Sequence, residues 1–318
     1  MAPARRDFAE LFEAITANVA RVVQGSPDAI RLALVAMVAE GHLLIEDVPG
    51  VGKTTLARAL AASVHGEWRR IQFTPDMLPS DVIGVTVYNR ELGTFEFRPG
   101  GVFTNVVLAD ELNRASPKTQ AALLEAMEES QVTVDATTYA LPRPFMVVAT
   151  QNPLERQGTY PLPDSQLDRF LMRVSLGYPG RPAELDMLDT HGAEVPAPAP
   201  EPVADPEDVE AMIATARAVH VARNLKGYIL ELADATRGHR DLALGMSPRS
   251  GLALLRAARA EAAASGRDHV LPDDVRRVAL PVLEHRLVLA TDARINGRTR
   301  RDVLEEMLSS VPVPVGQS

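Results

Sequence analysis

Asp47-Val48-Pro49-Gly50-Val51-Gly52-Lys53-Thr54 is the stretch of sequence that decides the fold. It follows a short apolar run, residues 42–46, and precedes a segment of helical character, residues 55–64. Except at its first position, where Asp47 replaces glycine, it matches the phosphate-binding loop G-x-x-x-x-G-K-[ST]. A strand, this loop and a helix in succession predict a nucleotide-binding α/β domain. The loop alone would also suit an ordinary strand-to-helix turn.

The residue types in this loop suit phosphate and magnesium. Gly50 and Gly52 let backbone N–H groups converge on phosphate oxygens, and the helix that follows adds the positive end of its dipole. Lys53 supplies a point charge for the β- and γ-phosphates, and the Thr54 hydroxyl can ligate Mg²⁺. We therefore expect ATP and Mg²⁺ as cofactors. Asp47 must adopt the entry geometry of the loop without the backbone freedom of glycine.

Two acidic residues end a second apolar run, Val106-Val107-Leu108-Ala109-Asp110-Glu111. A buried strand that ends in two acids places one carboxylate near the magnesium, and we assign this role to Asp110. Glu111 can then align and activate the attacking water. Adjacent residues on a straight strand face opposite ways, so the chain must bend here for both acids to serve one site. A solvated acidic turn is the alternative interpretation.

Three further polar residues are candidates with weaker local signals. Asn152, after the apolar run 147–149, can contact the γ-phosphate or the water, although an Asn before a proline is more often a turn residue. Arg169 and Arg249 stand at a helix end and a helix start. Taken alone, each arginine is better explained by a surface salt bridge.

The composition is that of a soluble globular protein, and the length allows two domains. The chain has 318 residues, 46% of them hydrophobic and 24% charged. Its net charge of −9 argues against a protein that works mainly by clamping nucleic-acid phosphates. The lack of cysteine excludes disulfides, thiolate catalysis and cysteine-ligated zinc, and suits a cytoplasmic setting. The most apolar early stretch, residues 29–45, is too short and too polar to span a membrane.

Strand-like and helical runs alternate along the first part of the chain. Their order predicts an α/β domain with a parallel sheet. Apolar and polar residues alternate over residues 82–97, which predicts an inserted β-hairpin. The predicted helices cover residues 7–23, 27–39, 55–64 and 117–130, and the predicted strands cover residues 42–46, 102–109 and 145–149.

A Pro-Ala tract, residues 195–202, marks a sharp change in composition and reads as a semi-rigid linker. Beyond it the pattern is almost entirely helical, which predicts a smaller all-α domain. Helices are expected over residues 206–221, 225–236, 248–265 and 272–282. We divide the chain into an α/β nucleotide-binding core (1–195), the linker (196–206), the all-α domain (207–310) and a flexible tail (311–318).

Several segments together resemble the MoxR family of AAA+ ATPases. The matching segments are 46–55, 109–120, 123–127, 149–153, 167–170, 247–249, 274–275 and 285–287. The Asp-Glu-Leu-Asn-Arg-Ala run that begins at Asp110 is highly specific, and the resemblance covers most of the chain.

The resemblance implies a role for each residue that matches a motif. Asn152 becomes sensor 1, and Arg249 becomes sensor 2 on a helical lid. Arg169 looks like an arginine finger, supplied to the ATP of a neighbouring subunit and worth about 10³–10⁵ in rate. The hairpin is similar to the helix-2 insert that lies toward the central pore of a ring. Lys53 and Thr54 are then Walker A residues, Asp110 and Glu111 Walker B residues, and the implied nucleotide contacts are Gly25, Pro49, Gly50, Val51, Gly52, Lys53, Thr54, Thr55 and Asp110.

The same resemblance implies an assembly and a partner. It suggests a hexameric homo-oligomeric ring of chaperone-like character that remodels or matures a protein, commonly one with a von Willebrand factor A domain. A nucleic-acid motor or loader and a metal-chelatase subunit stay open as alternatives. The hairpin carries Arg90 and Arg98 but also Glu91 and Glu96, and so lacks a clear basic track for nucleic acid. Intact Glu111 and Asn152 disfavour a nucleotide switch without turnover.

Overall fold

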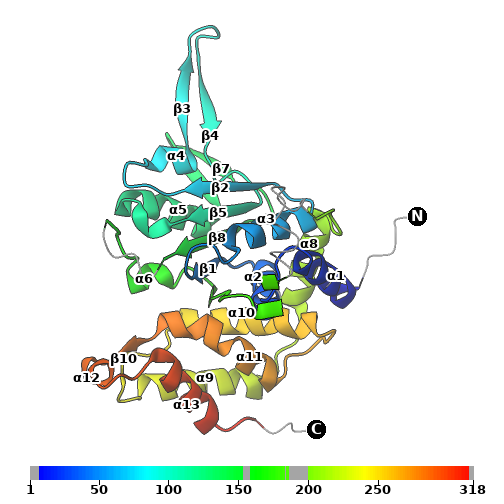
Figure 1. The fold of residues 1–318 in the computed structure, drawn as a ribbon, viewed down its shortest axis with the longest axis vertical. Helices are drawn as coiled ribbons and strands as arrows, with labels where there is room; N and C mark the ends of the chain where they lie inside the picture. Colours follow the sequence, from blue (N-terminus) through cyan, green and yellow to red (C-terminus); the bar gives the residue numbers. More distant parts are fainter. Residues whose placement is uncertain (1–6, 153–157, 183, 186–199, 315–318) are drawn as a thin grey trace.

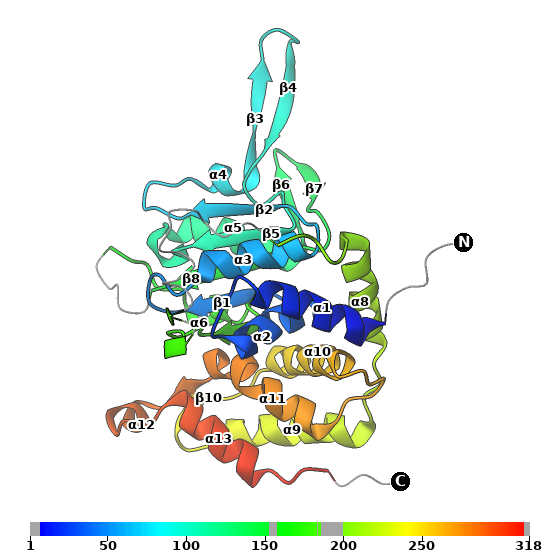
Figure 2. The same cartoon turned by 45° about the vertical axis from the view of Figure 1, so that its right-hand side comes forward.

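The computed structural model describes residues 7–152, 158–182, 184–185 and 200–314. Figure 1 shows an α/β part above and a group of helices, the lid, below. A hairpin of β3 (Gly84–Asn89) and β4 (Thr94–Pro99) projects from the top of the α/β part. Figures 1 and 2 place this hairpin and the lid at opposite ends of the molecule.

A five-stranded sheet forms the centre of the α/β part, in the order β2-β5-β8-β1-β9. Every neighbouring pair of strands is parallel, which confirms the predicted sheet. The strands are β1 (Leu43–Glu46), β2 (Trp68–Gln72), β5 (Val106–Asp110), β8 (Met146–Gln151) and β9 (Met172–Val174). Since β5 begins only at Val106, the first four residues of the run predicted as strand over 102–109 lie outside it.

Alternate residues of each strand face two separate layers of helices. Leu43 and Ile45 pack with α1, α2 and α3, whereas Leu44 between them packs on the other side with α5. A sheet covered on both faces needs strands that are apolar throughout, which is why these runs are short and continuously hydrophobic. The helices around the sheet are α1 (Phe8–Ala20), α2 (Pro27–Val38), α3 (Lys53–Ser63), α5 (Pro117–Glu129) and α6 (Asp164–Leu167), and the first four of them were predicted.

Two strands of the sheet carried no clear signal in the sequence. β2 is an outermost strand of the sheet, and its residues Arg69 and Arg70 are exposed, so it lacks the apolar run of a buried strand. β9 has only three residues. Both strands are recognised through their pairing with β5 and β1, which the sequence does not display.

The inserted hairpin is present, but its limits differ from the prediction. Val82, the expected first residue, lies in the short helix α4 (Pro79–Ile83), and β4 continues to Pro99. A second hairpin, β6 (Gln131–Val134) with β7 (Thr137–Ala140), was not predicted. Its two-residue turn is Asp135-Ala136, with φ of 48° and 67°. Because such turns usually contain Asn-Gly or Asp-Gly, the alanine hides this hairpin in the sequence.

Helices make up most of the lid, as predicted. α8 (Pro206–Ala218), α9 (Arg223–Arg237), α10 (Pro248–Ala264) and α11 (Pro272–Leu283) correspond to the four expected helices. Three of them begin with proline, which suits a first helical position because its missing N–H would be unpaired there anyway. The other elements are the 3₁₀ turn η2 (Glu284–Arg286), α12 (Thr291–Ile295), α13 (Arg300–Ser310), and the antiparallel pair β10 (Leu242–Leu244) and β11 (Val288–Leu289).

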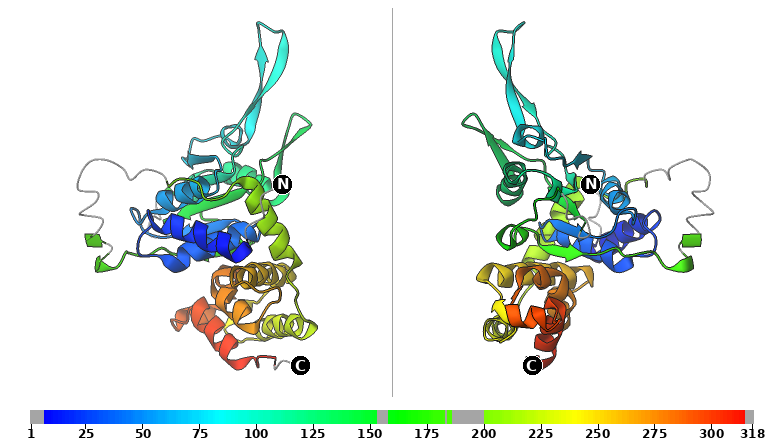
Figure 3. Two further views of the ribbon diagram at one scale, coloured as in Figure 1. Left: turned by 90° about the vertical axis from the view of Figure 1, so that its right-hand side faces the viewer. Right: turned by 60° about the vertical axis from the view of Figure 1, so that its left-hand side comes forward.

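The lid and the α/β part share one hydrophobic core. α10 packs against α1, α2 and α8, and one buried cluster includes Phe12, Leu34 and Leu254. Figure 3 shows the lid directly beneath this layer of helices. Val203 and Ala204, in the part of the predicted linker (196–206) that the structure describes, donate their N–H groups to the Ser63 carbonyl.

Parts of the predicted domain limits fall outside the described residues. These are the core boundary at residue 195, the linker residues 196–199 and the tail residues 315–318. The division of the chain into four ranges therefore stays a prediction. Among the residues that are described, no helix is both long and apolar enough to cross a membrane.

Gly41→Ala is predicted to lower the free energy of unfolding by about 1–3 kcal/mol, the usual range for overpacking. An added Cβ would lie 2.4 Å from Leu171 Cβ and 2.3 Å from Leu171 Cδ2, so the start of β9 would have to move. Urea unfolding of both proteins measures the difference. Gly227→Ala, in α9 with no atom within 4 Å of its added Cβ, is the matched control and should be neutral or slightly stabilising. Equal effects of the two substitutions would contradict the packing shown.

Candidate active site

The phosphate-binding loop connects β1 to α3. β1 ends at Glu46 and α3 begins at Lys53, with Gly52 as its N-cap. Gly50 and Gly52 have φ of 86° and 93°, values that residues with side chains rarely adopt. An added Cβ at either glycine would meet no atom within 4 Å. Glycine is thus required for its conformation, and the space beside the loop stays open for a ligand.

Asp47 stabilises the loop entrance through its side chain. Its φ is not positive, so this position does not need glycine. Oδ2 accepts hydrogen bonds from Ser175 Oγ at 2.9 Å and from the N–H groups of Leu176 and Gly177 at 2.8 Å, and Oδ1 accepts from the Val48 N–H at 2.9 Å. Burial acts to raise the pKa of this carboxyl, but these hydrogen bonds hold it below its ordinary value. The residue that departs from the loop motif therefore ties the end of β1 to the segment after β9.

Lys53 is directed into the loop and faces acidic groups. Its Nζ donates a hydrogen bond to the Asp47 carbonyl at 2.8 Å. Burial lowers the pKa of Lys53, while the negative charges of Asp110, Asp47 and Glu111 act to raise it. These interactions bring the loop lysine and the two acids predicted from the sequence to one place.

The chain bends between Asp110 and Glu111, as two acids in one site require. Asp110 is the last residue of β5, and Glu111 has φ 56° and ψ 46°, in the left-handed region. The Thr150 hydroxyl on β8 joins the two acids, because it donates to Asp110 Oδ1 at 2.5 Å and accepts from the Glu111 N–H at 3.0 Å. Thr150 is only 1% exposed. Its role was missed in the sequence, since it depends on the register of β8 beside β5.

Two arginines, neither predicted as a site residue, form ion pairs with the two acids. Arg70 on β2 places its Nε 3.0 Å from Asp110 Oδ2. Arg114, in the 3₁₀ turn η1 (Leu112–Arg114), places its Nη1 2.9 Å from Glu111 Oε2. The Arg114 and Glu111 side chains are 42% and 34% exposed, and an ion pair of this kind is worth only about 0–1 kcal/mol, so Glu111 can exchange Arg114 for a ligand at small cost. Arg70 is 48% exposed, but its partner Asp110 is only 14% exposed, so this second pair is partly buried.

The oxygen donors at this edge of the sheet fit magnesium. Thr54, in the first turn of α3, offers a hydroxyl, and Asp110 offers a carboxylate. Mg²⁺ usually takes one or two carboxylates and completes its shell with phosphate oxygens and water. The described residues contain no group of three or more His, Cys, Asp or Glu side chains that could hold a metal ion on their own. The donor set suits an ion that arrives with nucleotide phosphates.

Asn152 and Gly25 lie near the same edge of the sheet. Asn152 follows β8, whose neighbours β1 and β5 lead into the loop and the two acids. Gly25 has φ 85°, and an added Cβ would lie 2.9 Å from Pro179, beyond the segment that Asp47 ties down. The neighbouring Ser26 hydroxyl donates to the Leu176 carbonyl at 2.9 Å. Pro49, Val51 and Thr55 complete the loop and the first turn of α3.

Arg169 and Arg249 lie at the opposite edge of the sheet. This is the edge where the parallel strands begin, whereas the loop and the two acids lie at the edge where they end. Arg169 precedes β9, and the N–H of Leu171, two residues further on, donates to the carbonyl of His42, immediately before β1. Since β1 and β9 are parallel, the loop after β1 leaves the sheet at the other edge. Arg249, in the first turn of α10, lines the same cavity as Arg169 and His42. The sequence-predicted site is thus divided between two edges.

One carboxylate on α5 holds both arginines. Glu128 Oε2 lies 3.2 Å from Arg169 Nη1, and Glu128 Oε1 lies 3.1 Å from Arg249 Nη2. Arg169 Nη1 also donates to the Leu124 carbonyl at 2.8 Å, and Arg249 Nε lies 3.5 Å from Asp168 Oδ2. Salt bridges were the expected explanation of each arginine taken alone. That both share one carboxylate is a tertiary feature that the sequence does not reveal.

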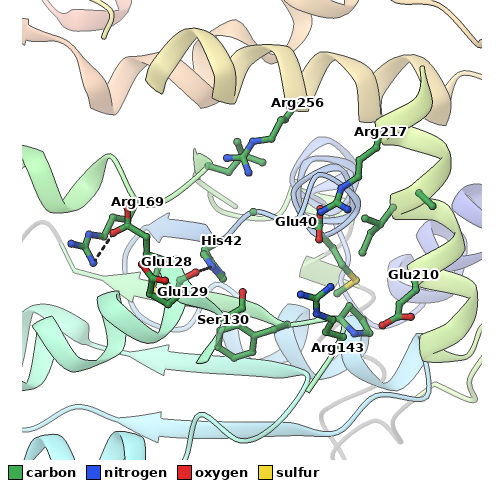
Figure 4. A pocket seen from close by; sticks show the side chains of 18 of the residues that line it. Glu40, His42, Glu128, Glu129, Ser130, Arg143, Arg169, Glu210, Arg217 and Arg256 are labelled. Carbon is green, nitrogen blue, oxygen red and sulfur yellow. Dashed lines mark hydrogen bonds and ion pairs between the residues drawn. The ribbon is translucent and has the colours of Figure 1, made fainter. Parts of the chain in front are cut away.

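A cavity of about 480 Å³ opens beside these arginines, between the strand edge and helices α8 and α10. Figure 4 shows Arg169 and Arg217 at opposite ends of it, with Arg256 reaching in from α10. Residues 47–54, all of which the structure describes, do not line this cavity. It is therefore separate from the phosphate-binding loop of the same chain.

Known proteins are similar to this chain over nearly its whole length. Residues 42–172 match the ATPase family associated with various cellular activities (AAA), and residues 234–307 match the AAA lid domain. A protein named YeaC from Bacillus subtilis is 47% identical over 99% of this chain and 98% of its own length. Chaperone MoxR1 from Mycobacterium tuberculosis is 39% identical over 93% of this chain and 81% of its own length. The chain belongs to the MoxR family of AAA+ ATPases.

A solved structure supports the same assignment for this MoxR protein. The crystal structure of a proposed ATPase from Cytophaga hutchinsonii matches with a TM-score of 0.91 and 38% identity, over 97% of this chain and 96% of that one. The AAA+ core with its lid domain, expected from the sequence, is confirmed. The chain is an ATP hydrolase.

Asp47→Ala is predicted to lower the free energy of unfolding by about 1.5–3 kcal/mol, the range for hydrogen bonds to a charged group. Urea unfolding at neutral pH measures it, and Asp234→Ala, whose carboxylate is 75% exposed, is the control. Because folding lowers the pKa of Asp47, its contribution is complete above the unfolded value of about 3.9 and is lost as pH falls through the folded value. The deficit of Asp47→Ala should therefore shrink below about pH 4, and a deficit that grows in acid would contradict this interpretation.

Lys53→Ala is predicted to abolish measurable nucleotide binding, since a lost charged contact of this kind costs about 2–5 kcal/mol. Titration with a fluorescent ATP analogue measures the affinity. Lys118→Ala, an exposed lysine on α5, is the control and should bind normally. Unchanged affinity in Lys53→Ala would mean that the loop is not the nucleotide site.

Proposed function

We propose that this protein is a Mg²⁺-dependent ATPase that assembles into a ring, in which each active site is completed by the neighbouring subunit. The observation that carries this proposal is the division of the site between the two edges of the sheet. The phosphate-binding loop, Asp110 and Glu111 lie at one edge, and Arg169 and Arg249 share Glu128 at the other. Residues that cannot meet within one chain meet when the arginine edge of one subunit faces the loop of the next.

In the proposed site each residue has a defined task. The loop N–H groups and Lys53 hold the phosphates, and Thr54 with Asp110 holds Mg²⁺. The metal, when bound, neutralises charge on the β- and γ-phosphate oxygens. Glu111, released from Arg114, orients and activates the attacking water, and Asn152 contacts the γ-phosphate or that water.

Arg169 and Arg249 supply positive charge from the neighbouring subunit. Charge of this kind stabilises the transition state of phosphoryl transfer by about 10³–10⁵ in rate. Both arginines are bound to Glu128 in the single chain, so we assign both of them, sensor 2 included, to the neighbour's ATP. Glu128 keeps them partnered until a phosphate replaces it.

The output of hydrolysis is proposed to be the remodelling or maturation of a protein partner by a hexameric ring. Support comes from the relative named Chaperone MoxR1 and from the projecting hairpin. Tyr88 and Phe95 on that hairpin are 55% and 74% exposed, and Leu92 at its tip is 65% exposed. Exposed apolar side chains of this kind suit contact with protein. A partner with a von Willebrand factor A domain is proposed from the family resemblance.

A mixing experiment tests the shared site. Arg169→Ala and Glu111→Gln proteins are each expected to hydrolyse little ATP. Mixed in equal amounts, they should recover about a quarter of the wild-type rate, because random pairing around a head-to-tail ring puts an intact loop next to an intact arginine at that fraction of sites.

Arg301→Ala is the matched control for that experiment, since Arg301 on α13 is 62% exposed and pairs only with Glu305 among the described residues. It should hydrolyse ATP at the wild-type rate when unmixed. If Arg169→Ala alone is fully active, or if mixing restores nothing, the shared-site proposal is wrong.

A further inference from the structure

Arg286 of the lid is almost completely buried against the segment that carries Arg169. It ends the turn η2, directly after α11, and is 7% exposed. The residues it contacts, 168–171, are named here the finger segment. A buried guanidinium is costly unless its hydrogen bonds are satisfied. The partners of Arg286 therefore indicate what it is held there to do.

All five N–H donors of Arg286 are used, and four of them bind the finger segment. Nε donates to Asp168 Oδ1 at 2.6 Å, and Nη2 donates to the carbonyls of Asp168 at 3.1 Å and Phe170 at 2.7 Å. Nη1 donates to the Leu171 carbonyl at 3.0 Å and to the Val282 carbonyl of α11. The backbone on both sides of Arg169 is thus fixed by one lid residue, and this sets the direction in which the Arg169 side chain leaves the chain.

His285 reinforces the same contact. It is fully buried, and its Nε2 lies 3.0 Å from the Phe170 carbonyl. Burial and the positive charge of Arg286 hold the pKa of His285 well below its ordinary value, so the ring is neutral. Because a carbonyl can only accept, the proton of the neutral ring resides on Nε2. His285 and Arg286 together form what we call the lid clamp.

The lid clamp also reaches the second arginine, and the neighbouring Glu284 reaches the strand of the loop. The Asp168 carboxylate that Arg286 holds through Oδ1 faces Arg249 Nε through Oδ2, at 3.5 Å. Arg173 of β9 lies between Glu284, 2.8 Å away in the lid, and Glu46, 3.0 Å away at the end of β1. Lid, finger segment and β1 are therefore joined by polar contacts, and satisfied networks of this kind make the positions of the groups they connect more rigid.

We propose that Arg286, assisted by His285, is a positioning residue for ATP hydrolysis that sets Arg169 for the site of the neighbouring subunit. It acts through the finger segment and touches no nucleotide. The orientation of a subunit's lid then decides whether that subunit can serve its neighbour. This inference rests on the proposed function of Arg169 between subunits.

Mixing in two directions separates positioning from a merely structural role. In the first mixture, the Glu111→Gln protein supplies its arginine to the Arg169→Ala protein. In the second mixture, the protein that supplies the arginine carries both Glu111→Gln and Arg286→Lys, and its partner is again Arg169→Ala. The second mixture should lose about tenfold or more of the recovered kcat, because a misplacement of about 1 Å is worth that much or more. Its KM should not change, since the loop subunit is the same in both mixtures.

In the reverse direction, Arg286→Lys alone is combined with Glu111→Gln. Here Arg286→Lys supplies the loop and Glu111, and its partner supplies an intact arginine, so these sites should hydrolyse ATP at the rate of the reference mixture. Arg267→Met in the Glu111→Gln donor is the matched control, because Arg267 forms a bidentate ion pair with Asp274 elsewhere in the lid. This control should lower the melting temperature but donate its arginine normally.

Asp168→Asn in the same donor is the second variant, in case Arg286→Lys does not fold. It keeps the carbonyl contacts of Arg286 and should reduce the recovered kcat in the same direction, by less. Full recovery with both Arg286→Lys and Asp168→Asn, or equal losses in the two directions, would overturn the positioning role while leaving the shared site intact. If Glu111→Gln itself restores no activity to Arg169→Ala, the proposed shared site fails, and the positioning role fails with it.

Discussion

The parallel order of β1, β5 and β8 is the constraint on which the site depends. Parallel strands all end at one edge of the sheet, so the phosphate-binding loop, Asp110 and Asn152 emerge together. Arg169 precedes the parallel strand β9 and therefore lies at the other edge. No rotation of side chains within one chain overcomes a separation set by the length of the strands, and this is why we propose that the site is completed by a second subunit.

Buried polar contacts hold the two edges in shape. At the loop edge, Asp47 fixes the segment after β9, and Thr150 fixes the bend between the two acids. At the arginine edge, Arg286 directs four of its five donors to the chain around Arg169. Removing one partner of such a contact leaves a buried group unsatisfied, at about 1–3 kcal/mol or more. The more exposed pair of Arg114 with Glu111 is by contrast weak enough to exchange for a ligand.

The features predicted from the sequence are those that depend on the order and spacing of neighbouring residues. The loop, the acids after β5 and the helices that start with proline each occupy a few consecutive residues with a characteristic order. The roles of Thr150, Glu128 and Arg286 depend on strand register and on how the lid packs, so no short window of sequence contains them. Asp47 was expected to fit the loop entrance poorly because the sequence does not show its hydrogen-bond partners. Those partners, Leu176 and Gly177, lie more than a hundred residues away.

The structure of the Glu111→Gln protein assembled with ATP and Mg²⁺ tests the central claim most directly. The account predicts that Arg169 leaves Glu128 and contacts an ATP molecule whose β-phosphate is bound by Lys53 of the adjacent subunit. Arg169 should lie within hydrogen-bond distance, about 2.7–3.2 Å, of the γ-phosphate of that ATP. It also predicts that Arg286 keeps its contacts with residues 168–171 in that state. An assembled particle in which Arg169 stays on Glu128, and each ATP is contacted by one chain only, would contradict it.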